Sequence, residues 1–64
     1  MITDLDIYRA ANLLINRHGA NALIEAARMI DRVGDHGDVE GRFVWFRIKR
    51  AIEVLQAPPG GAVH

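Results

Sequence analysis

The chain contains neither cysteine nor serine. Without cysteine it can form neither a disulfide bond nor a thiolate metal site. Its single threonine, Thr3, stands where it can cap a helix, so the side chains that usually act as catalytic nucleophiles are almost lacking. We therefore expect a protein that is not an enzyme, with no catalytic, cofactor-binding or metal-binding residues.

An excess of charge of one sign and a long apolar run are also missing. Eight basic residues balance eight acidic ones, which argues against a protein dedicated to nucleic acid or to a membrane surface. No apolar stretch approaches the ~18 residues of a membrane-spanning helix. The start, "MITDLDIYR", has no basic region of the kind found in a signal peptide. These features predict a cytoplasmic protein without a membrane partner.

Proline occurs only near the end of the chain, in "APPGGAVH". Pro58 and Pro59 would stop a helix, so we expect a flexible tail over 57–64 after a domain over 1–56. Half of the 64 residues are apolar, so the domain should fold. A core of this size without a staple is marginal, which makes association with a second copy plausible.

Apolar residues recur with helical spacing through the domain, and no strand alternation competes with them. The expected fold is all-α, a compact three-helix domain with antiparallel helical hairpins, and the helices should span about 3–18, 20–33 and 38–56. Thr3 with Asp6 fits a capping box, and Asp38 fits an N-cap. Gly19 and Gly34 fit helix ends.

The inward-facing positions of these helices predict the core. Its members should be Ile7, Ala11, Leu14, Ala26, Ile30, Gly41, Trp45, Ile48, Ile52 and Leu55. We expect Trp45 at the centre, near Leu14 and Ile30. Gly41 would be tolerated in a first turn because another helix crosses close by. His18 falls on the inner face of the first helix, where a structural role is expected.

The stretch "RFVWFRIKR" gives the third helix two apolar faces. A core stripe runs from Gly41 to Leu55, and a second stripe holds Val39, Phe43, Phe46 and Val54, interrupted by Arg50. Arg42, Lys49 and Glu53 separate the stripes on one side, and Glu40 and Arg47 on the other. An apolar cluster of this kind usually marks an interaction site.

We therefore expect a small protein–protein interaction module that forms a homodimer through its third helix. The predicted interface residues are Phe43, Phe46, Arg47, Arg50, Val54, Leu13 and Ile24. Burial of these side chains within the monomer, or under a different protein, remains an alternative.

A nucleic-acid-binding regulator that uses the basic helix 42–50 is the alternative from another class. Its cations, Arg42, Arg47, Lys49 and Arg50, point in different directions around the helix, and Asp38 and Glu40 occupy the start of the helix, where base edges are usually approached. An acidic stretch over 31–40 lacks the alternating spacing of a calcium loop, so capping and solvation account for it.

About four fifths of the chain resembles a group of small helical proteins of alphaproteobacteria, a domain of unknown function. The resemblance lies in His18-Gly19, in the run Gly37-Asp38-Val39-Glu40-Gly41, in Trp45, and in an Ile-x-x-Ala-Ile-x-x-Leu ending at Leu55. It implies a helical fold and no particular activity. The turn before Gly41 is also similar to one hairpin of a tetratricopeptide repeat, whose Trp-x-x-Leu-Gly opening is missing here.

Overall fold

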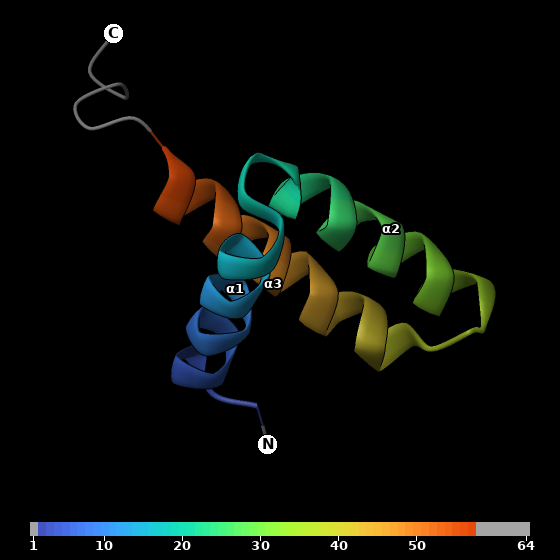
Figure 1. Ribbon diagram of the computed structural model, residues 1–64. Helices are drawn as coiled ribbons and strands as arrows, with labels where there is room; N and C mark the ends of the chain where they lie inside the picture. The colour runs from blue at the N-terminus through green and yellow to red at the C-terminus, as the bar shows by residue number, and fades with distance from the viewer. Residues whose placement is uncertain (1, 58–64) are drawn as a thin grey trace, which may run out of the picture.

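A computed structural model of the chain describes residues 2–57. Helix α1 spans Asp4–His18, a short 3₁₀ turn η1 spans Gly19–Asn21, α2 spans Ala22–Asp35 and α3 spans Val39–Gln56 (Figure 1). No strand occurs among these residues, so the all-α, three-helix fold predicted from the sequence is confirmed. The predicted tail over 57–64 lies, apart from Ala57, outside the described residues.

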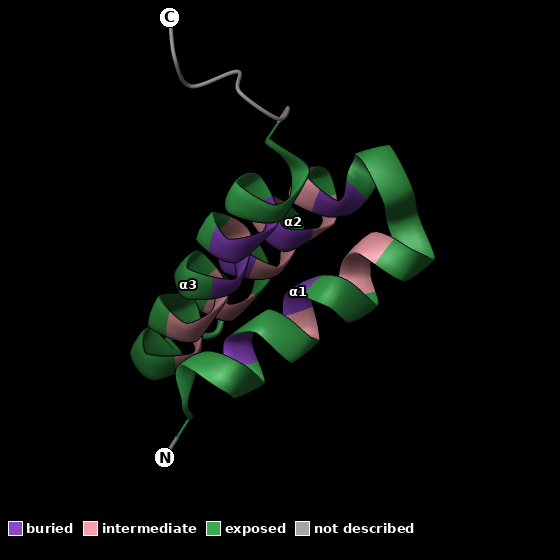
Figure 2. Cartoon of the chain, turned by 90° about the vertical axis from the view of Figure 1, so that its left-hand side faces the viewer, coloured by how far each residue is buried: buried purple, intermediate pink, exposed green. Residues whose placement is uncertain are grey.

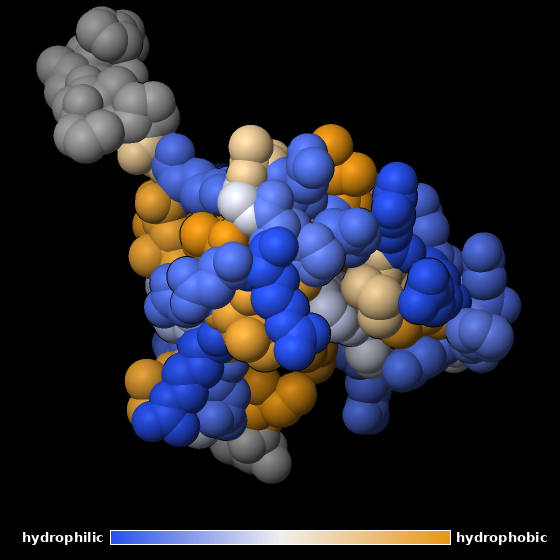
Figure 3. Space-filling model, viewed as in Figure 1, coloured by the Kyte–Doolittle hydropathy of each residue, from blue (hydrophilic) through white to orange (hydrophobic). Residues whose placement is uncertain are grey.

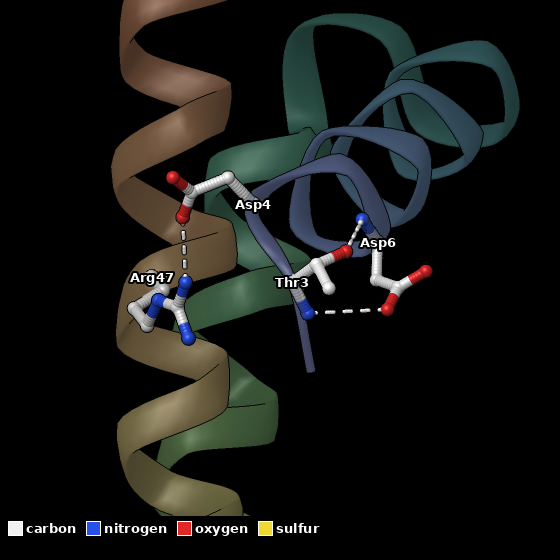
Figure 4. A network of polar contacts seen from close by, with 4 residues as sticks. All are labelled: Thr3, Asp4, Asp6 and Arg47. Atoms are coloured by element: carbon white, nitrogen blue, oxygen red, sulfur yellow. Dashed lines mark hydrogen bonds and ion pairs between the residues drawn. The ribbon is translucent and has the colours of Figure 1, made fainter. Parts of the chain in front are cut away.

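The start of α1 is held by the capping box that the sequence predicts. The Oγ1 atom of Thr3 accepts a hydrogen bond from the Asp6 N–H at 3.2 Å, and Oδ2 of Asp6 accepts one from the Thr3 N–H at 3.1 Å (Figure 4). The bond from the Thr3 backbone, followed by the one from its side chain, lowers the pKa of Asp6. The capping box thus satisfies the N–H groups of Thr3 and Asp6 by bonds between neighbours in sequence.

The turn between α2 and α3 departs from the prediction in two ways. Helix α2 does not stop at Gly34 but continues to Asp35, and the turn is made at Gly37, whose φ of +74° favours glycine. Asp38 then caps α3 as predicted, since its Oδ1 accepts a hydrogen bond from the Gly41 N–H at 2.8 Å.

The glycine at 41 has a reason within its own turn. The space that a Cβ of Gly41 would take is occupied by the Asp38 carboxylate, to which the three nearest atoms all belong. Gly41 is only half-buried and is not part of the core. The first turn of α3 therefore combines a weak helix former with a close-fitting cap.

Helices α2 and α3 lie side by side as an antiparallel hairpin, and α1 packs mainly against α3 (Figure 1). Two polar contacts mark the ends of the α1–α3 contact. Arg47 Nη2 donates to Asp4 Oδ1 at 2.7 Å, and Gln56 Nε2 donates to the Gly19 carbonyl at 2.9 Å. Helix α1 therefore covers the second half of α3, and the first half is left to α2.

The core lies where the three helices face one another (Figure 2). Its buried side chains are Ile7, Ala11, Ala22, Ala26, Ile30, Ile48, Ala51 and Ile52. Half of these are alanines, which let helices approach closely and leave little volume for large groups. Ile52 is the one large side chain among the described residues that is fully buried.

Four of the predicted inner positions are less buried than expected. Trp45 and Leu14 pack against the core but stay half-buried. Trp45 is not the centre because it precedes the part of α3 that α1 covers. Leu55 is 43% exposed, since the last turn of α3 extends beyond the other helices (Figure 1). His18 is exposed because α1 ends there and the chain turns away.

The helices over residues 2–57 include none whose length and apolar character would let it cross a membrane.

Candidate interaction surface

The second stripe of α3 lies on the side of the helix away from the core. Val39 is 66% exposed, Phe43 68% and Phe46 47%, which is unusual for two aromatic side chains in so small a domain. At 100° per residue these positions fall opposite Ile48 and Ile52, which are buried against the other helices. The structure therefore gives α3 one face that is covered and one apolar face that stays largely exposed.

The first two turns of α3 hold an open hollow lined by Val39, Arg42, Phe43 and Phe46. The Arg42 guanidinium lies over the Phe46 ring, with its carbon 5.6 Å from the ring centre, a cation–π arrangement. The hollow measures about 180 Å³, whereas pockets for small molecules usually measure ~300–1,000 Å³. The hollow is therefore smaller than the usual pocket for a small molecule.

A second groove continues from Phe46 towards α1. It is lined by Phe46, Arg47 and Arg50 of α3 together with side chains that include Asp4 and Tyr8 of α1. Arg47 and Asp4, which both line this groove, form an ion pair between α3 and the start of α1 (Figure 4). Four of the predicted interface residues are thus brought together here or in the hollow beside it: Phe43, Phe46, Arg47 and Arg50.

The other predicted interface residues lie elsewhere. Val54 is exposed on the same helix side but beyond both hollows, and Leu13 and Ile24 are each 54% exposed on α1 and α2. Neither Leu13 nor Ile24 lines the two hollows. In the view of Figure 3, apolar side chains are interspersed with charged ones, so this face of the molecule shows no single large apolar area. The participation of Leu13 and Ile24 remains a prediction.

Three residues join the surface that the predicted interface had left out: Val39, Arg42 and Tyr8. The helical spacing did place Val39 in the second stripe, and Arg42 stands four residues before Phe46, where side chains meet. Tyr8 is exposed on α1 beside the groove. No signal in the sequence could place Tyr8 there, because the packing angle of α1 decides it.

Several cations of α3 already have partners within the molecule. Arg47 pairs with Asp4 at 2.7 Å, Lys49 approaches Glu53 at 3.9 Å, and Arg42 lies over Phe46. A surface that recognises nucleic acid would present its cations together on one face. These three cations are thus engaged within the molecule and do not form one shared basic face.

No protein-family profile, curated protein or solved structure matches this chain.

Proposed function

We propose that this protein is a small helical interaction module that self-associates through the second stripe of α3. The exposure of Phe43 is the observation that carries the proposal. It stands between Val39 and Phe46 on a helix whose opposite face already builds the core. Aromatic side chains clustered on one outward helix face are typical of helix-pairing interfaces.

The size of the core supports association. Four of the eight buried core residues are alanines, and Ile52 is the one large side chain fully removed from solvent in the described part of the chain. Domains of this length rarely gain more than ~3–5 kcal/mol from a single core. Covering Phe43 and Phe46 with a second copy would add apolar burial that the monomer does not provide.

A second copy is the partner that the composition of this surface favours. Its flanks carry both signs of charge, with Glu40 and Arg47 on one side and Glu53 with two cations on the other, so the surface can complement itself. With about 200 Å² for an exposed aromatic side chain, Phe43 and Phe46 offer about 230 Å² per copy.

Burial of that area in two copies is worth on the order of 10 kcal/mol, against an association cost of ~4–15 kcal/mol. The two phenylalanines thus carry much of the energy needed, and the flanking side chains must supply the rest. This balance favours a reversible dimer over an obligate one.

Sedimentation velocity and light scattering over a wide range of protein concentration test the proposal. We expect a monomer–dimer equilibrium for the natural chain. Phe46→Glu should give a monomer that keeps its helical circular dichroism. Leu5→Glu is a matched control, because it places the same charge at an exposed apolar position on α1 that lines neither hollow and is not a predicted interface residue, and it should keep the dimer.

Two results would overturn the proposal. One is a monomer at every concentration of the natural chain. The other is a dimer that survives Phe46→Glu unchanged.

A further inference from the structure

The sequence of the second stripe also defines how two copies would be oriented. We propose that the two α3 helices pair antiparallel, with Phe43 of each copy against Phe46 of the other and Glu40 of each facing Arg47 of the other. This inference rests on the proposed self-association. It adds the direction and register of the pairing.

The spacing of the stripe selects a register. Val39, Phe43, Phe46 and Arg50 are separated by four, three and four residues, the alternation of seam positions in paired helices. The seam has a valine at one end and an arginine at the other. A parallel pair would place Arg50 directly against Arg50 of the second copy, two like charges at the edge of an apolar contact.

An antiparallel pair avoids this. It places Arg50 opposite Val39 of the second copy, and the two copies of Arg50 lie about 16 Å apart along the seam, from a rise of ~1.5 Å per residue. The two phenylalanines then form two equivalent aromatic contacts about the twofold axis, because Phe43 and Phe46 exchange places between the copies.

The charges on one flank favour the same arrangement. Glu40 and Arg47 lie on one side of the stripe, seven residues apart. In an antiparallel pair, the side of α3 that carries Glu40 and Arg47 lies beside the same side of the other copy. Each Glu40 then meets Arg47 of the other copy, and two attractive pairs form. Parallel helices bring opposite flanks together, and Arg42 would then meet Arg47, giving two repulsive pairs.

On the other flank, like charges would repel in the antiparallel pair, but more weakly than Glu40 and Arg47 attract. There Arg42 would approach Lys49 of the second copy. The charge of Lys49 is partly balanced by Glu53 at 3.9 Å, and Arg42 is held over the Phe46 ring. Arg47 is also paired, with Asp4 at 2.7 Å, but its side chain stays 46% exposed, so a Glu40 carboxylate of a second copy can share it. The balance over both flanks and the seam favours the antiparallel pair.

Disulfide trapping in the full chain tests the orientation, since the natural chain has no cysteine. The variants Val39→Cys and Arg50→Cys are oxidised separately and as an equal mixture, and the products are identified by mass. The antiparallel pair predicts that the mixed disulfide dominates, because a disulfide needs Cβ atoms ~3.5–4.5 Å apart. Efficient disulfide formation by each variant with a second copy of itself, and not with the other variant, would show a parallel pair and overturn the orientation.

A charge exchange provides a second measurement that does not depend on cysteine. Arg47→Glu should weaken the antiparallel dimer by about tenfold, and the double variant Glu40→Arg/Arg47→Glu should restore it. In a parallel dimer Arg47→Glu would instead tighten association, because it removes the repulsion from Arg42. The natural chain remaining monomeric would overturn the proposed function itself. If the natural chain dimerises but the Arg47→Glu variant associates more tightly, or the mixture of Val39→Cys and Arg50→Cys chains forms no mixed disulfide, the orientation alone is overturned.

Discussion

Replacing Phe43 with alanine tests most directly whether the exposed face of α3 is an interface. Phe43 is 68% exposed, which corresponds to about 140 Å² of its side chain. At ~25 cal/mol per Å², full coverage by a partner would contribute about 3 kcal/mol per copy. Two copies contribute in a symmetric dimer, so even half coverage means about 3 kcal/mol per dimer, or roughly a hundredfold increase in Kd.

The same substitution should leave the monomer almost unaffected. Phe43 is not part of the core, so the free energy of unfolding of the monomer should change by less than ~0.5 kcal/mol. The dimer dissociation constant is measured by sedimentation equilibrium, and monomer stability by urea unfolding at a concentration below that constant. A loss of more than ~2 kcal/mol in the monomer would refute the reasoning, because it would show that Phe43 is covered by its own chain.

Three further predictions concern the fold. Ile52→Ala should lower the free energy of unfolding by ~2–5 kcal/mol and remove most of the cooperative thermal transition seen by circular dichroism. Ile24→Ala, at an exposed site, should leave that transition intact, and equal melting curves for the two variants would contradict the assigned core. Gly41→Ala should hardly change the free energy of unfolding while Asp38 is present, but it should raise that free energy by ~1 kcal/mol in an Asp38→Ala chain. A double-mutant cycle measured by urea unfolding tests this, and additive effects would count against the close-fitting cap. The pKa of Asp6 is lowered in the folded chain, so the stability that its carboxylate contributes is complete above the usual pKa of 3.8 and is lost as pH falls through the folded pKa. Asp6→Asn should therefore flatten the acid side of the curve of unfolding free energy against pH, and an unchanged slope would rule this out.

The helices and most of their ends could be predicted from the sequence. The caps at Thr3 and Asp38 depend on bonds between residues three apart in the chain, so local sequence suffices to place them. The end of α2 could not be placed as well, because two glycines stand near it and only the one at 37 adopts a positive φ. Helix ends of this kind depend on the path to the next helix.

The burial of individual side chains was harder to predict. A helical wheel marks the inward face of α3, and Ile48 and Ile52 are indeed buried there. It does not say how far a neighbouring helix extends along that face. Trp45 lies before the part of this face that α1 covers, and Leu55 lies in the last turn of α3, and both are less buried than the wheel suggests.

The sequence by itself determined the all-α class, the helical segments and the presence of two apolar faces on α3, because periodicity and capping act over a few residues. The tertiary structure decided which large side chain occupies the centre, since alanines on three helices draw the backbones together around Ile52. It also decided that α1 lies beside Arg47 and Arg50 and leaves Phe43 uncovered. The crossing of α1 over α3 depends on contacts between residues more than 30 positions apart, which no local pattern specifies.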